Sequence, residues 1–308
     1  PLRLVGSEMC IRDSPSTETI LQLRFTGVFL CYETSKTEKK VQTVRIIYCG
    51  DVVARAGRDA VLNNLSKLRE RYKPDAVIVN IENAAHGFGA SPSICRQFLD
   101  AGVDALVTGN HVWQQRDLIP FLDECKRIVR PLNYPEGLPG KGAIEIELPN
   151  GKKILIAQLL GRLFMEAVDC PAQAIDKLLK NYTLGKNINA IFVDIHAEAT
   201  AEKIEIGHYL DGRVSAVIGS HTHIPTSDYC IRDGGTAYQT DVGMCGDYNS
   251  VIGFDKTEPL NRLLRKYTGG RLTPAKGPGT LFGVLIDIDD KSGKATHIEQ
   301  IKMSETEA

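Results

Sequence analysis

The chain has 308 residues, 43% hydrophobic and 24% charged, which is the composition of an ordinary globular protein. Its 37 basic and 38 acidic side chains leave a formal net charge of -1, so no overall field attracts nucleic acid or an anionic membrane. No run of apolar residues approaches the ~18 to 20 that a membrane-spanning helix needs. These features exclude an integral membrane protein, and we expect neither a stable nucleic-acid complex nor a membrane partner.

Eight cysteines are spread along the chain without any C-x-x-C pair. Several lie in apolar runs that are typical of strand or helix cores. A disulfide framework is not expected in a domain of this size, so we interpret the cysteines as reduced thiols. We therefore predict a reducing compartment and a cytoplasmic location.

The first 42 residues differ from the remainder of the chain. They show neither a helical nor a strand-like hydrophobic period, and they end in the polar run from Glu33 to Lys40. The order of segments that defines a signal peptide is absent, and the string from Gly6 to Ser14 looks like translated sequencing adapter. We expect residues 1–42 to be a disordered or artefactual tail, and residues 43–304 to form a single domain.

From Thr43 onward, short apolar runs alternate with amphipathic stretches, which is the pattern of a layered α/β fold. The first part of this region predicts strands at 44–49, 76–79 and 103–107, with helices from about 58 to 72 and from 93 to 100 between them. Lys73-Pro74 ends the first helix, because the residue before a proline is biased away from helical backbone. Three βα units therefore follow one another.

The second part predicts antiparallel as well as parallel pairing. Apolar and charged residues alternate strictly over 143–148, and Pro149-Asn-Gly151 turns the chain back into a strand at 153–160. Further strands are expected at 190–195, 214–218, 280–288 and 295–301, with a helix at about 201–209. We expect an α/β fold, in the layered α+β sense, with a mixed sheet flanked by helices.

Polar residues of types that bind metals follow five of the predicted strands directly. In chain order they are Asp51; Glu82 and Asn83; Asn110 beside His111; His196; and His221 and His223. The loops beyond the carboxyl ends of parallel strands meet at one crevice, where ligands bind. We therefore expect these side chains to lie together.

The residue types indicate what this crevice would hold. Three histidines with aspartate and glutamate supply donors for a first-row divalent ion, and asparagine oxygens add neutral ligands. Seven donors exceed what one ion needs, whereas two ions that share a carboxylate account for them all. Two ions ~3.5 to 4 Å apart lower the pKa of a bridging water, which gives hydroxide at neutral pH, and hold the phosphoryl oxygens during in-line attack. The residues thus predict a binuclear site for phosphoester hydrolysis, without choosing between iron, manganese and zinc.

The ordered motifs resemble the calcineurin-like metallophosphoesterase superfamily, although Val53 stands where that superfamily usually has a ligand histidine. With Glu82-Asn-Ala-Ala85, Arg130-Pro-Leu-Asn-Tyr-Pro135 and Thr240-Asp-Val-Gly-Met244, the chain closely resembles the bacterial YmdB-like family of 2',3'-cyclic-nucleotide 2'-phosphodiesterases. The similarity runs from about Val44 to Ile301. It implies a sandwich of mixed sheets flanked by helices, and a hydrolase acting on small cyclic nucleotides, with 2',3'-cyclic ones preferred over 3',5'-cyclic ones.

The resemblance also implies a role for each site residue. The first ion would be held by Asp51, Glu82, Asn83 and His223, and the second by Glu82, Asn110, His196 and His221. His111 would be free to act as the general acid that protonates the leaving alkoxide. Family members are described as iron-dependent, so we expect two divalent ions, iron or alternatively manganese. A homo-oligomer is compatible with the sequence.

Two other functions stay open at this stage. The same ions could serve a phosphomonoesterase that acts on phosphoproteins, or the protein could be a regulatory nucleotide- or RNA-binding protein with slow turnover. The substrate-binding residues are also undecided. Arg162 and Lys203 are candidates for phosphate contacts, but a loop arginine in a salt bridge and a solvated helix lysine are equally good interpretations.

Overall fold

The computed structural model describes residues 43–265 and 270–304, so the predicted tail at 1–42 lies outside the described residues. Within the described ranges, no helix combines the length and the apolar character that a membrane crossing requires. The six cysteines in these ranges, among them the buried Cys49 and Cys245, form no disulfide.

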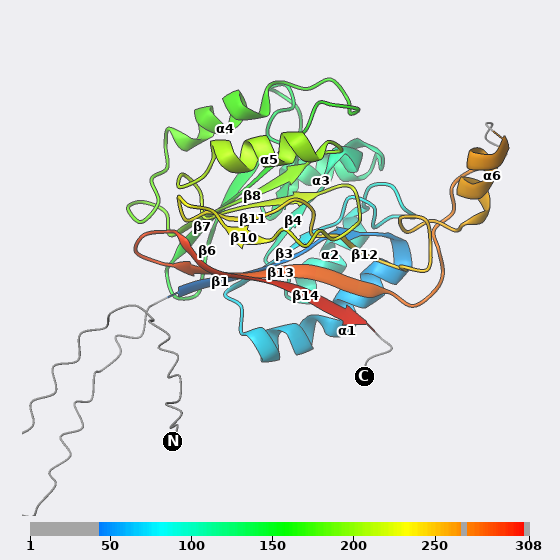
Figure 1. Ribbon diagram of the computed structural model, residues 1–308, viewed down its shortest axis with the longest axis horizontal. Helices are drawn as coiled ribbons and strands as arrows, with labels where there is room; N and C mark the ends of the chain where they lie inside the picture. The colour runs from blue at the N-terminus through cyan, green and yellow to red at the C-terminus, as the bar shows by residue number, and fades with distance from the viewer. Residues whose placement is uncertain (1–42, 266–269, 305–308) are drawn as a thin grey trace, which may run out of the picture. The chain divides into compact units, whose positions relative to one another are not determined.

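Two six-stranded sheets pack face to face (Figure 1). The first has the order β14 (Ala295–Ser304), β13 (Thr280–Asp289), β1 (Thr43–Cys49), β3 (Ala76–Asn80), β4 (Ala105–Val107) and β5 (Ile128–Val129). The second has the order β10 (Cys230–Ile231), β11 (Ala237–Gln239), β9 (Ala216–Ser220), β8 (Ala190–His196), β7 (Lys153–Leu160) and β6 (Ala143–Glu147). The strands β1, β3, β4 and β5 are parallel, as are β7, β8, β9 and β11. The short strands β2 (Asp51–Val52) and β12 (Met244–Cys245) form a separate parallel pair.

Helices cover the outer face of each sheet, which produces an α/β/β/α layering (Figure 1). The first sheet is covered by α1 (Ala54–Tyr72), α2 (Pro92–Asp100) and α3 (Leu118–Glu124), and the second by α4 (Pro171–Leu179) and α5 (Thr200–Tyr209). The apolar stripe of α1, which includes Val61, Leu65 and Leu68, is buried in this contact. The 3-10 helix η1 (Asn110–Trp113) and the helix α6 (Thr257–Arg265) lie in connections between strands.

The interior between the sheets is apolar and leads directly to a polar edge. Tyr48 of β1 faces this interior, whereas Ile47 and Cys49 face the helices. Because both faces of β1 are buried, its sequence is a nearly continuous apolar run. The rings of Tyr48 and Phe192 meet across the two sheets with centroids 5.0 Å apart. The Tyr48 hydroxyl donates a hydrogen bond of 2.9 Å to Asp194 at the polar edge.

The predicted layered α/β fold is confirmed, and so is the hairpin of β6 and β7. The first helix begins at Ala54 rather than near Arg58. The sequence did not reveal this start, because the residue before the helix is Val53, which offers no side-chain cap. The polar strand ends, which the local pattern placed at the crevice of one sheet, come from two sheets. The strand β1 pairs with the distant β13, and such non-local pairing has no local signature.

Candidate metal centre

The predicted ligand side chains lie at the carboxyl ends of strands from both sheets. Asp51 follows β1, Glu82 and Asn83 follow β3, and Asn110 follows β4; in the second sheet His196 ends β8, and His221 and His223 follow β9. Ion pairs and hydrogen bonds connect all of these side chains. Asp51 and His196 have no exposed surface at all. The structure therefore brings every predicted ligand to one place, most of them buried, while their roles as ligands stay predictions.

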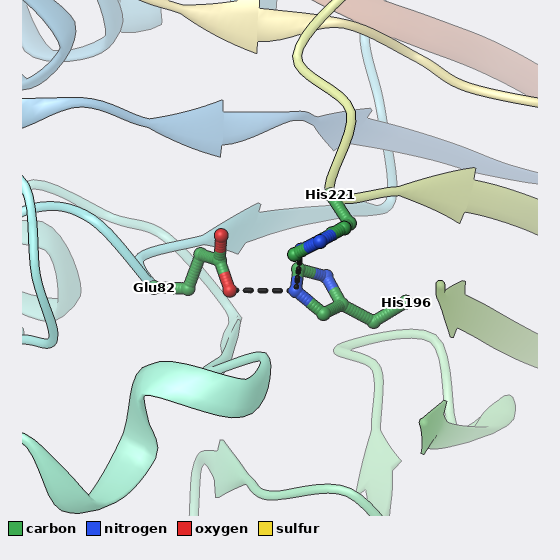
Figure 2. A group of neighbouring side chains, drawn as sticks. All are labelled: Glu82, His196 and His221. Carbon is green, nitrogen blue, oxygen red and sulfur yellow. Dashed lines mark hydrogen bonds and ion pairs between the residues drawn. The ribbon is translucent and has the colours of Figure 1, made fainter. Parts of the chain in front are cut away.

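The first group of candidate ligand atoms belongs to four side chains, which are Glu82, Asn110, His196 and His221. Figure 2 shows Glu82 beside the buried His196 ring and His221 above it, each joined to that ring by a dashed line. The Nε2 atom of His196 lies 2.6 Å from Glu82 Oε2, 3.0 Å from Asn110 Oδ1 and 3.1 Å from His221 Nδ1. A ring nitrogen carries at most one hydrogen, so it cannot donate to all three neighbours. A cation between these atoms would satisfy all four.

Hydrogen bonds behind His196 decide which of its ring nitrogens carries the hydrogen. Ser220 Oγ donates to Asp194 Oδ1 over 2.7 Å, so it accepts from His196 Nδ1, which is also 2.7 Å away. The Asp194 carboxylate is fixed in turn by donors from Tyr48 and Gln158. In its neutral form the His196 ring therefore directs the lone pair of Nε2 into the site, which is the arrangement of a metal-binding histidine.

The second group consists of Asp51, Glu82 and His223, whose ligand atoms lie within 4.8 Å of one another. His223 Nδ1 donates to the Ile252 carbonyl over 2.8 Å. Its Nε2 atom is then free to face Asn83 Oδ1 at 3.3 Å and Glu82 Oε1 at 3.8 Å. The first group has the same close spacing, and Glu82 belongs to both.

The electrostatics of both groups favour positive charge. Burial by itself would lower the pKa of His196 and of His223, but Glu82 and Asp51 outweigh it and raise each pKa to about 9. Burial opposes the charge of Glu82 as well, yet the facing histidines keep its pKa well below the ordinary value. Burial and the nearby Glu82 raise the pKa of Asp51 to about 7. Protons can therefore supply the positive charge that metal ions would supply when bound.

His111 lies next to this centre in η1, one residue beyond Asn110. Its ring packs edge-on against Phe88 with centroids 5.2 Å apart. Its Nδ1 atom is buried and has no hydrogen-bond partner among the described residues. Burial lowers the pKa of His111, so its imidazole is mainly neutral at pH 7. The side chain is therefore close to the ligand set without belonging to it.

Comparison with known proteins agrees with this geometry. Residues 47–301 match the family described as YmdB-like protein. The chain belongs to this family. A relative, the 2',3'-cyclic-nucleotide 2'-phosphodiesterase of Bacillus subtilis (strain 168), is 44% identical over 262 residues, which are 85% of this chain and 98% of the relative.

Two solved structures resemble the YmdB-like chain throughout its domain. A hypothetical protein from Thermus thermophilus has a TM-score of 0.79 and 40% identity, and the match covers 85% of this chain and 99% of that one. A novel phosphatase from Mycoplasma pneumoniae has a TM-score of 0.80 and 32% identity, over 86% of this chain and 94% of that one. The family resemblance inferred from the sequence is confirmed, and the Bacillus subtilis and Mycoplasma pneumoniae relatives are named as a phosphodiesterase and a phosphatase.

Sequence reasoning missed several side chains that support the candidate ligands of this YmdB-like chain. Asn80 donates to Asp51 Oδ1 over 2.7 Å and accepts from the Glu82 backbone amide over 3.0 Å, so it holds the Asp51 carboxylate and the backbone of Glu82. The Glu198 carboxylate lies 3.3 Å from His221 Nε2, which leaves His221 Nδ1 for the centre. Both residues lie at or just beyond strand ends, but nothing in their type separates them from ordinary surface residues.

Gly109 marks a space within the centre that a side chain would fill. Its φ of 58° and ψ of -159° form a backbone conformation that is essentially restricted to glycine. A Cβ atom at this position would lie 2.0 Å from Glu82 Oε2 and 2.8 Å from His196 Nε2. The donor set and this small space together fit a bound metal ion.

We expect the Gly109→Ala variant to lose at least one of the two proposed ions, as measured by atomic emission after dialysis against Mn²⁺. Gly151→Ala is the matched control, because Gly151 also has a positive φ, of 78°, but a Cβ there meets nothing within 4 Å. Gly151→Ala should lose about 1 kcal/mol of stability from its positive φ, and Gly109→Ala should lose more, because its Cβ would also collide with Glu82 and His196. Equal metal content in the two variants would show that the space beside Gly109 holds no ion.

Proposed function

We propose that this protein is a phosphodiesterase that hydrolyses 2',3'-cyclic nucleoside monophosphates with two divalent metal ions. The observation that carries the proposal is the Glu82 carboxylate, which two groups of ligand atoms share. The first ion would be completed by Asp51, Asn83 and His223, and the second by Asn110, His196 and His221. Similarity to the Bacillus subtilis 2',3'-cyclic-nucleotide 2'-phosphodiesterase supports this substrate class.

The protein residues would orient the metal ligands and protonate the leaving group, while the ions would supply the positive charge that stabilises the phosphoryl oxygens. When bound, two such ions lower the pKa of a shared water and stabilise negative charge on the phosphoryl oxygens. Ser220 and the Ile252 carbonyl hold the Nδ1 atoms of His196 and His223, so the two Nε2 atoms would be available to bind the ions. His111 would donate a proton to the ribose oxygen that leaves.

Iron is the proposed metal, with manganese as the alternative. Imidazole nitrogens suit iron, and carboxylate and amide oxygens suit manganese, so the mixed donor set accepts either ion. The family resemblance favours iron. A cytoplasmic location and a homo-oligomeric state belong to the same proposal.

The test is a product assay on the full chain, purified anaerobically and loaded with Fe²⁺ or Mn²⁺. With 2',3'-cyclic AMP we expect 3'-AMP as the product, because the bond to the 2' oxygen breaks, and chelator-treated protein should be inactive. Bis-p-nitrophenyl phosphate should be cleaved faster than p-nitrophenyl phosphate. Faster cleavage of the monoester would favour a phosphomonoesterase, and nucleotide binding without turnover would favour a regulatory protein.

Metal binding should release protons. His196 and His223, with pKa values raised to about 9, are protonated at pH 7 in the metal-free protein, and a histidine must be neutral to bind a metal. Asp51, with a pKa raised to about 7, is partly protonated as well. Loading both ions at pH 7 should therefore release at least about two protons, and metal affinity should rise with pH until pH 9 is passed. Calorimetric titration of Mn²⁺ in buffers of different ionisation enthalpy measures this release. Heats at pH 7 that do not depend on the buffer would contradict it.

A further inference from the structure

Lys203 is neither a solvated helix lysine nor an exposed phosphate contact. Its side chain is completely buried under α5, and so is the side chain of its partner Asp241, which follows β11. The Nζ atom of Lys203 lies 2.8 Å from Asp241 Oδ2. A lysine and an aspartate without any exposed surface need a reason to be retained, because taking both charges out of water is costly.

The Asp241 carboxylate binds the residue that separates the two candidate histidine ligands. Its Oδ2 atom accepts from the Thr222 amide at 3.1 Å and from the Thr222 hydroxyl at 2.7 Å, in addition to Lys203. Its Oδ1 atom accepts from the Gly243 amide at 2.8 Å. The Met244 amide donates to the His223 carbonyl over 3.2 Å, so the segment 241–244 lies directly against the turn formed by residues 221–223.

The turn that Asp241 holds has an unfavourable backbone. His221 has a φ of 96° and His223 a φ of 67°, both in the left-handed region that side chains other than glycine avoid. Such conformations persist only where the surroundings fix them, and they are concentrated at functional sites. Here the surroundings act from two sides, because Asp51 Oδ2 accepts from the His221 amide at 3.0 Å and Asp241 accepts from Thr222.

We propose that Lys203 and Asp241 form a positioning pair that holds the His221-Thr222-His223 turn in the geometry required for metal binding. Lys203 neutralises the buried Asp241, and Asp241 fixes the amide and the hydroxyl of Thr222. General stability is a poor reason for the pair, since apolar replacements of buried ion pairs are often as stable. This inference rests on the proposed metal centre, to which it adds two residues that touch no ion.

The test replaces both charges at once, with the variant Lys203→Met/Asp241→Asn in the full chain. A single Lys203→Met change would leave a buried unpaired carboxylate and could prevent folding. The matched control is Lys152→Met/Asp290→Asn, which removes another largely buried pair, 3.0 Å apart, at the opposite end of the strands from the centre. The probe is Co²⁺ added to chelator-treated protein, because its visible absorption reports both the affinity and the ligand geometry.

We expect the Lys203/Asp241 double variant to bind Co²⁺ about 10- to 100-fold more weakly, as is usual when a partner behind a metal ligand is lost. Its visible spectrum should change, while the control keeps the wild-type affinity and spectrum. Wild-type Co²⁺ binding in the double variant, or an equal loss in the control, would overturn the proposal. If wild-type protein bound no Co²⁺, the metal centre itself would be wrong.

Thr222→Val keeps the inference testable should the double variant fail to fold. It removes one hydrogen bond to Asp241 and leaves both charges and the side-chain volume in place. We expect Co²⁺ affinity to fall by up to about 10-fold, with an altered spectrum. An unchanged affinity and spectrum in a folded Thr222→Val variant would also overturn the proposal.

Discussion

The Glu82→Gln variant should bind neither metal ion tightly and should lose at least about 1,000-fold in kcat/KM for 2',3'-cyclic AMP. Glutamine keeps the size of the side chain but removes the charge that both groups of ligand atoms share. Metal ions contribute several kcal/mol to the transition state of phosphoryl transfer, and about 1.4 kcal/mol corresponds to a factor of ten. Atomic emission and steady-state kinetics measure the two effects.

Two further variants make the Glu82 experiment specific. Glu145→Gln changes a carboxylate of β6 that is ion-paired with Lys153 far from the centre, and it should leave metal content and rate unchanged. Asp51 supplies a ligand atom to one group only, so the Asp51→Asn variant should lose less bound metal than Glu82→Gln. Two bound ions and a rate near that of the wild type in Glu82→Gln would contradict a shared carboxylate.

The His111→Ala variant should keep its metal but lose about 10²- to 10⁴-fold in kcat for cyclic nucleotides, which is the usual contribution of a general acid. The leaving ribose oxygen needs a proton, whereas p-nitrophenolate leaves without one. With bis-p-nitrophenyl phosphate the loss should therefore be less than about tenfold. Equal losses on both substrates would assign His111 another role.

The pH dependence gives an independent check on His111. Burial lowers the pKa of this imidazole, so its protonated form is abundant only in more acidic solution than for an ordinary histidine. If the imidazolium is the acid, wild-type kcat/KM, which reports the free enzyme, should fall as pH rises through this lowered pKa. The His111→Ala variant should lack that fall, which forms the alkaline limb of the pH–rate profile. The same limb in both proteins would exclude His111 as its source.

The sequence predicted the strands of the centre well, because each is an apolar run followed directly by a polar residue. Ala76–Asn80 is buried along its whole length and is followed by Glu82, a pattern that can be found without a structure. The division into two sheets could not be derived in this way. It depends on pairs such as β1 with β13, which are formed by residues distant in sequence.

Buried polar side chains were the other limit of sequence reasoning. Lys203 lies in a helix with acidic neighbours, where a lysine is nearly always solvated. Only its contact with Asp241, 38 residues later, shows that it is buried. Asn80 and Ser220 are similar cases, since each supports a candidate ligand from another part of the chain.

The position of β1 also determines when during protein synthesis the centre can be completed. This strand, which leads into Asp51, lies between β3 and β13, and its Arg45 is ion-paired with Asp287, 242 residues later. All candidate ligands have been translated once His223 is made, but β1 has only β3 as a neighbour until β13 leaves the ribosome. Non-local pairing of this kind forms late in folding. Metal insertion should therefore be an event of finished chains, and nascent chains that end before β13 should hold the ions only weakly.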